Sequence, residues 1–185
     1  RRAELQYMAD VFVKTARRLA QDAPDAHFVC PMVSRAMRDM FELALRRHGA
    51  GELPLTLLFG HSHEALAAAE VALVASGTAT LETALFKTPM VITYRQSPVT
   101  SLLMRRMIYL PYIGLPNILA GEAFVPEFVQ EKATPGALAG ALLALLDDPA
   151  ARRAQVERFH AIHLLLRKNT AEVAADAVLR VLDGA

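Results

Sequence analysis

A small group of polar residues stands at one point of the chain, in the stretch ASGTATLE. The apolar run before it is typical of a buried strand, and the residues after it have the pattern of a helix. In an open parallel sheet, ligands bind where the carboxyl end of a strand meets the start of the next helix. Unpaired backbone N–H groups and the helix dipole favour an anion at such a point. Ser76, Gly77 and Thr78 are therefore candidate ligands of a phosphate group.

Glu82 follows Thr78 by four residues, so both side chains lie on one face of the predicted helix. A carboxylate one turn from a phosphate is well placed to accept hydrogen bonds from sugar hydroxyls, as the acid of dinucleotide folds does for ribose. The alternative is that Ser76 or Thr78 only caps the helix and that Glu82 is a solvated surface acid. Neither GxGxxG nor GxxxxGK[ST] occurs, so neither a classical NAD site nor a P-loop is supported.

The elements that must position this corner follow from the apolar pattern. Short apolar runs alternate with helical patterns, which predicts an α/β fold with a Rossmann-like parallel sheet flanked by helices. We expect strands at 27–30, 55–59, 71–75 and 90–94. We expect helices at 3–20, 34–47, 63–69, 78–86, 99–109, 134–146, 150–167 and 170–182, with an irregular loop between the fifth and sixth. This organisation predicts one α/β domain over residues 1–146 and a helical C-terminal extension over 147–185.

Composition excludes several classes of protein. Hydrophobic residues make up 54% of the 185 residues, which argues against disorder. Aromatic residues make up 6%, with no Trp, and the formal net charge is +1, so neither a stacking platform for single-stranded nucleic acid nor bulk attraction for it is expected. Cys30 is the single cysteine, which excludes an intrachain disulfide and suits a reducing, cytoplasmic setting. The longest apolar runs fall short of the roughly 18 residues that a spanning helix needs.

Other polar groups have weaker claims to chemistry. His61 and His63 are separated by one residue, and no third metal ligand converges with them, so we expect no metal site. The pair Asp147 and Asp148 precedes a proline and is interpreted as the end of a helix. The segment Met104–Leu110 is apolar with two arginines, and it suits either a packed helix or contact with lipid head groups.

Four motifs in this order carry a resemblance to a known family: ASGTATLE, PMVITYR, GLPNILAG and VPEFVQE. Together they resemble the C-terminal half of lipid-A-disaccharide synthase, a glycosyltransferase of the GT-B type with two Rossmann-like halves that face a cleft. The resemblance covers nearly the whole chain. It includes the opening RRAE, which is similar to the end of the family's Gly-Ser-Arg-x-x-Glu loop, and the closing KNTAE.

The resemblance implies an inverting reaction without a cofactor. Family members join UDP-2,3-diacylglucosamine to 2,3-diacylglucosamine 1-phosphate, which gives the lipid A disaccharide and UDP. The chain would be the donor-binding half, and the general base would come from the N-terminal half of the same protein. Expected partners are the two acylated sugars, that N-terminal half and a second copy of the protein, with no nucleic acid. The expected location is the cytoplasm of a Gram-negative bacterium, in peripheral contact with the inner membrane.

The resemblance also implies roles for single residues. Arg1 and Asn117 would stabilise charge at the leaving diphosphate, in the catalytic role. Residues expected to bind the UDP donor are Gly60, His61, Ser76, Gly77, Thr78, Glu82 and Asn117. Two alternatives to this function stay open: another UDP-sugar enzyme of the same half-fold, such as a UDP-GlcNAc epimerase or a different GT-B transferase, and a non-catalytic nucleotide-binding module.

Overall fold

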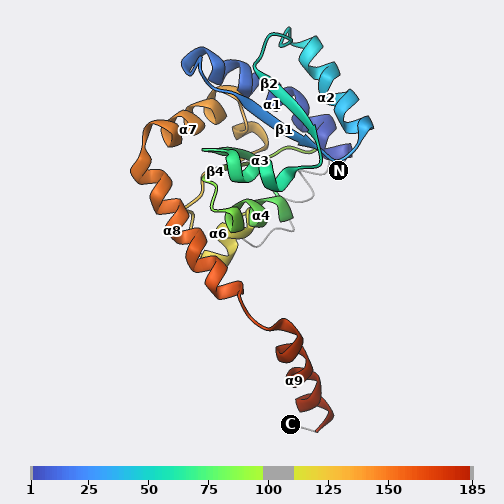
Figure 1. The fold of residues 1–185 in the computed structure, drawn as a ribbon, viewed down its shortest axis with the longest axis vertical. Helices are drawn as coiled ribbons and strands as arrows, with labels where there is room; N and C mark the ends of the chain where they lie inside the picture. The colour runs from blue at the N-terminus through green and yellow to red at the C-terminus, as the bar shows by residue number, and fades with distance from the viewer. Residues whose placement is uncertain (1, 98–110, 184–185) are drawn as a thin grey trace.

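The computed structural model describes residues 2–97 and 111–183, which form parallel strands surrounded by helices (Figure 1). In chain order the elements are α1 (Arg2–Asp22), β1 (Phe28–Met32), α2 (Arg35–Arg47), β2 (Leu55–Phe59), α3 (Ser62–Ala68), β3 (Ala72–Ala75), α4 (Thr78–Phe86), β4 (Met90–Tyr94), α6 (Leu115–Ala120), β5 (Glu127–Val129), a 3₁₀ helix (Gln130–Lys132), α7 (Pro135–Asp147), α8 (Pro149–Leu166) and α9 (Thr170–Leu182). The predicted α/β class, with parallel strands flanked by helices, is confirmed.

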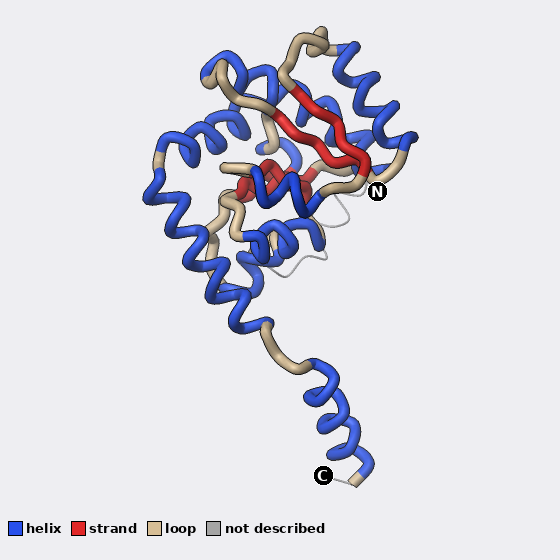
Figure 2. Tube along the Cα trace, viewed as in Figure 1, coloured by secondary structure: helices blue, strands red, loops and turns tan. Residues whose placement is uncertain are grey.

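The strands form two parallel sheets rather than one continuous ladder (Figure 2). One sheet pairs β1 with β2, and the other has the order β3-β4-β5. Within the described residues, β1, β2, β3 and β5 each have a hydrogen-bonded neighbour on one side alone. The parallel pairing within each sheet is that of a Rossmann-like fold.

Helix α1 packs against both sheets and joins their cores. Its residues Leu5, Ala9 and Val13 lie in the cluster with the first sheet and α2. Val11 and Leu19 lie in the cluster with α7 and β4. Because apolar residues on two sides of α1 are buried, the helix holds the two sheets in one body.

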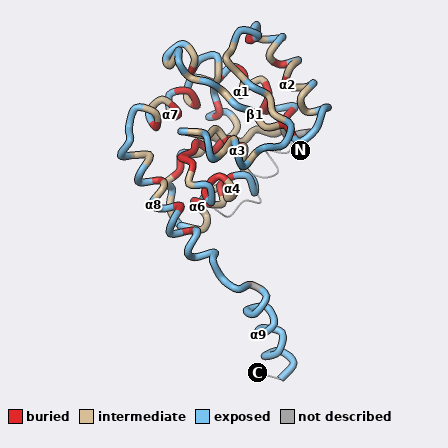
Figure 3. Tube along the Cα trace, in the orientation of Figure 1, coloured by how far each residue is buried: buried red, intermediate tan, exposed pale blue. Residues whose placement is uncertain are grey.

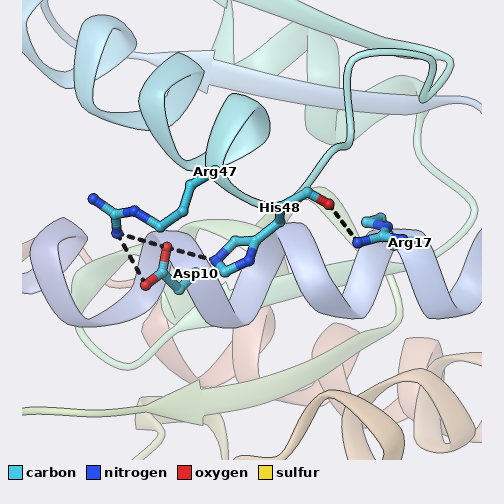
Figure 4. Close-up of polar contacts among 4 residues, drawn as sticks. All are labelled: Asp10, Arg17, Arg47 and His48. Atoms are coloured by element: carbon cyan, nitrogen blue, oxygen red, sulfur yellow. Dashed lines mark hydrogen bonds and ion pairs between the residues drawn. The ribbon is translucent and has the colours of Figure 1, made fainter.

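A polar cluster fixes the end of α2 on α1 (Figure 4). Asp10 on α1 lies 2.9 Å from Nε2 of His48 and 3.3 Å from Nη1 of Arg47. The His48 contact lies within ion-pair distance, but its geometry is not that of a well-aligned hydrogen bond. Arg17, two turns further along α1, donates to the carbonyl of His48. Burial raises the pKa of Asp10, but the neighbouring His48 and Arg47 outweigh it, so the pKa lies below its ordinary value.

The C-terminal helices differ in how they pack. On α8, Phe159 is fully buried, and the side chain of Gln155 bonds both the N–H and the carbonyl of Met90. By contrast, α9 stands away from the body and is exposed along its length (Figures 1 and 3). Its exposed apolar residues are Val173, Val178, Leu179, Val181 and Leu182. Among the described residues, no helix combines the length and apolar content that crossing a bilayer requires.

The expected irregular loop before α7 is wrong in part, because it contains α6 and β5. These elements have six and three residues, too few for a periodic pattern to be recognised in sequence. The helix expected at 99–109 and the Met104–Leu110 segment lie outside the described residues.

Candidate functional site

The corner between β3 and α4 is open and uncapped. Gly77 is the N-cap residue of α4, and among the described residues no side chain accepts from the first turn of that helix. The alternative that Ser76 or Thr78 caps the helix is therefore wrong. Gly77 has φ 142° and ψ −162°, a conformation that is accessible essentially to glycine alone. Gly77, Thr78 and Ala79 are exposed, so the N–H groups at this helix start are accessible to a ligand.

The corner is bonded to the loop that precedes α6. Ser76 donates its hydroxyl to the carbonyl of Ile113 at 2.7 Å. Thr80 donates to the carbonyl of Gly77 at 2.7 Å and accepts from the N–H of Leu115 at 3.3 Å. The motifs ASGTATLE and GLPNILAG therefore meet in space, although about 35 residues separate them.

A clamp of two side chains, Asn117 and Glu127, holds this loop from the other side. The Glu127 carboxylate accepts from the N–H groups of Ile113 and Gly114 at 2.8 and 2.9 Å, and from the Asn117 amide at 2.8 Å. Glu127 is not among the site residues predicted from the sequence. The available signal was its position as a single acid in the otherwise apolar start of VPEFVQE.

Asn117 differs from its expected role. Its side chain is fully buried and bonds the carbonyl of Val125 and the N–H groups of Phe124 and Val125, in addition to Glu127. An amide has two donor hydrogens and two acceptor lone pairs, so this side chain has no capacity left for a phosphate or a sugar. In this conformation Asn117 positions the loop and does not face a ligand.

The loop after β2 has an unusual backbone. Gly60 and His61 have φ 68° and 54°, and a left-handed histidine is a conformation often associated with functional loops. Both residues are exposed, and the His61 ring lies 3.0 Å from Glu64. The hydrogen bond from His61 is the largest cause of the lowered pKa of Glu64.

Glu82 is paired rather than simply solvated. Nε2 of His63, on α3, lies 2.7 Å from Oε1 of Glu82, on α4. Because α3 follows the Gly60–His61 loop, this contact joins the helix after β2 to the helix after β3. Six of the predicted donor-binding residues lie at the carboxyl ends of these two strands or on the helix that follows: Gly60, His61, Ser76, Gly77, Thr78 and Glu82. Arg1 lies outside the described residues.

The remaining polar groups that the sequence singled out are possible metal ligands and the pair Asp147 and Asp148. Among the described residues, no three His, Cys, Asp or Glu side chains are grouped so that they could hold a metal ion. Helix α7 ends at Asp147, as predicted, and Asp148 accepts from the N–H groups of Ala150 and Ala151 and caps α8.

Comparison with known proteins decides the family of this chain. The family model described as lipid-A-disaccharide synthetase matches residues 1–181. The chain belongs to this family. It is 54% identical over 182 residues to the lipid-A-disaccharide synthase of Azoarcus sp. (strain BH72), a match that covers 98% of this chain and 46% of the relative.

Two further relatives agree. The chain is 53% identical over 184 residues to the lipid-A-disaccharide synthase of Dechloromonas aromatica (strain RCB), covering 99% of this chain and 48% of that protein. It is 47% identical over 179 residues to that of Methylobacillus flagellatus, covering 97% and 47%. The chain therefore spans about half the length of the curated relatives that it matches.

Proposed function

We propose that the full-length protein is an inverting glycosyltransferase that joins UDP-2,3-diacylglucosamine to 2,3-diacylglucosamine 1-phosphate, and that the chain described here binds the UDP donor. Membership in the lipid-A-disaccharide synthetase family supports this reaction. The observation that carries the donor-binding role is the exposed, uncapped start of α4 at Gly77, with the carboxylate of Glu82 one turn further on.

The proposed contacts follow the order of groups in the donor. The N–H groups at Gly77 and Thr78 and the Thr78 hydroxyl bind phosphate oxygens, since a helix start favours anions. Glu82 accepts from the ribose hydroxyls. The Gly60–His61 loop lies against the uracil. Arg1 completes the diphosphate site from the start of the chain, where a guanidinium suits two oxygens at once.

The chain's part in the reaction is to stabilise the leaving group. The acceptor hydroxyl attacks the anomeric carbon, the bond from that carbon to the diphosphate breaks, and negative charge builds on UDP. Fixed N–H groups and Arg1 stabilise this charge, and removing one such donor typically slows the reaction roughly 100- to 1000-fold. The general base that takes the proton of the acceptor hydroxyl is proposed to lie in the N-terminal half.

Partners of the chain are proposed on the same basis. The apolar residues of α9 are exposed here, so we propose that α9, the last helix of the extension, packs on the N-terminal half or on a second copy, whereas α8 packs on this domain. In a doubly wound sheet of order 3-2-1-4-5, one strand lies between the positions of β1 and β3. We therefore propose that a strand from the remainder of the protein pairs with β1 and β3, whose other sides have no hydrogen-bonded neighbour among the described residues. Because both substrates carry acyl chains, peripheral contact with the cytoplasmic face of the inner membrane is also proposed.

Calorimetry of the full-length protein with UDP, UMP and NAD tests the proposal. We expect UDP to bind more tightly than UMP, because the corner holds a diphosphate, and NAD not to bind. Preference for NAD would contradict the transferase function, and binding of none of the three would favour a non-catalytic module. An epimerase would act on UDP-GlcNAc without an acceptor, which a product assay with and without the acylated acceptor distinguishes.

A further inference from the structure

The pair His63 and Glu82 joins two helices that start at different subsites of the proposed donor site. A carboxylate accepts hydrogen bonds, so the N–H at Nε2 of His63 donates to Oε1 of Glu82 at 2.7 Å. The His63 ring also packs on Phe86, with ring centroids 4.9 Å apart and a tilt of 38°. His63 thus contacts α4 at two points one turn apart, which restricts the rotation of its ring.

The second oxygen of Glu82 has no partner among the described residues. The Glu82 side chain is 41% exposed, so this oxygen can be reached from solvent. A free glutamate side chain rotates about three bonds. If a ligand must fix it in one orientation, the side chain loses conformational entropy at binding, and this loss weakens the affinity. The bond from His63 restricts this rotation before the ligand arrives.

We propose that His63 is a positioning residue for nucleotide binding: it holds the Glu82 carboxylate so that the second oxygen accepts from the ribose diol. Because α3 begins directly after the Gly60–His61 loop, His63 also sets the spacing between the base loop and the ribose acid. The inference rests on the proposed ribose role of Glu82. It adds a residue that does not touch the ligand and acts through Glu82.

The contact is too exposed to matter much for folding. The side chains of His63 and Glu82 are 64% and 41% exposed, and exposed pairs contribute little to stability. A purely structural role would therefore leave ribose recognition unchanged when His63 is replaced. A positioning role changes the affinity for nucleotides that carry the diol and leaves the melting temperature nearly unchanged.

The test is titration of full-length protein with UDP and with 2′-deoxy-UDP, for wild type and for His63→Phe, His63→Gln and Glu82→Ala. Phenylalanine keeps the ring that packs on Phe86 and removes the donor, whereas glutamine keeps a donor.

We expect His63→Phe to weaken UDP binding roughly two- to fivefold, the range for a partly exposed charge-assisted bond, and to change 2′-deoxy-UDP binding less. His63→Gln should recover part of the loss. His160→Ala, at an exposed histidine of α8, should behave as wild type.

Each result decides between the two proposals. If Glu82→Ala removes the preference for UDP but His63→Phe binds both nucleotides as wild type does, positioning by His63 is overturned and the donor site stands. If His63→Phe weakens both nucleotides equally, the role of His63 is structural and the inference fails. If Glu82→Ala itself keeps the preference, the ribose role in the proposed function fails first.

Discussion

The amide of Asn117 donates to Oε1 of Glu127 at 2.8 Å, and this bond joins α6 to the start of β5. Both residues also bond backbone groups of the segment around them, so two side chains determine the shape of the loop before α6. Gly114 has no room for a side chain, since a Cβ there would clash with the Ile92 side chain and would lie 3.0 Å from Oε1 of Glu127. The loop is therefore held against the Ser76 corner by a buried network.

Replacing Asn117 should destabilise the protein before it affects chemistry. Asn117→Ala leaves the N–H groups of Phe124 and Val125 without an acceptor in a buried site, and we expect the free energy of unfolding to fall by about 2–3 kcal/mol. Urea unfolding of the full-length protein measures this. Asn169→Ala is the matched control, because the exposed Asn169 makes no side-chain bond to its helix. Unchanged stability together with a raised KM for the donor would instead support direct contact with the ligand.

The sequence predicted the elements on which the corner is built. The expected strands at 55–59 and 90–94 and the helix at 78–86 match β2, β4 and α4. Continuous apolar runs and uninterrupted helical patterns are local signals, and these elements have them. The strand-to-helix corner with its glycine was predicted for the same reason, because its backbone geometry depends on adjacent residues.

The parts that were not predicted depend on distant partners. Asn117 was interpreted as a ligand because its neighbours in sequence show nothing of Glu127, ten residues away, or of the backbone that it bonds. The pairing of Glu82 with His63, nineteen residues apart, has no local signal either. Tertiary contacts determine whether a polar side chain is free for a ligand or already satisfied, and a motif alone does not distinguish the two cases.

Gly77 should not tolerate a side chain. A Cβ there would meet no atom within 4 Å, so the penalty of Gly77→Ala comes from the backbone conformation and is about 1–3 kcal/mol. The new methyl group would also keep a phosphate from close approach, so the KM for the donor should rise. Gly140→Ala is the control. Gly140 is an exposed residue in the middle of α7, and its replacement by alanine should raise the free energy of unfolding by about 0.5–1 kcal/mol. Equal effects of the two substitutions on unfolding would contradict the strain at Gly77.

The Cys30 thiol should be inert in the folded protein. Desolvation by burial in β1 raises the pKa of Cys30 from 9.0 to about 11. At pH 8 roughly one thiol in a thousand is then a thiolate, and the thiolate is the reactive form. We expect a thiol reagent such as DTNB to modify the native protein slowly and the urea-unfolded protein at the rate of a free cysteine. Rapid modification under native conditions, without loss of structure, would contradict the raised pKa of this partly buried thiol.

Acid should weaken the attachment of α2 to α1 through Asp10 (Figure 4). The pKa of Asp10 lies below its ordinary value of 3.8 in the folded chain, because His48 and Arg47 outweigh the effect of burial. A depressed carboxyl pKa gives stability that is complete above the unfolded pKa and is lost as the pH falls through the folded pKa. Replacing the carboxylate by an amide removes that pH-dependent part, so Asp10→Asn should be less stable than wild type at pH 6, and the difference should shrink as the pH falls below the ordinary pKa of 3.8. Asp39→Asn, at an exposed acid on α2, is the control and should leave the pH dependence of the melting temperature as in wild type. A constant difference between Asp10→Asn and wild type from pH 7 to pH 3 would show that the cluster stabilises through packing and not through charge.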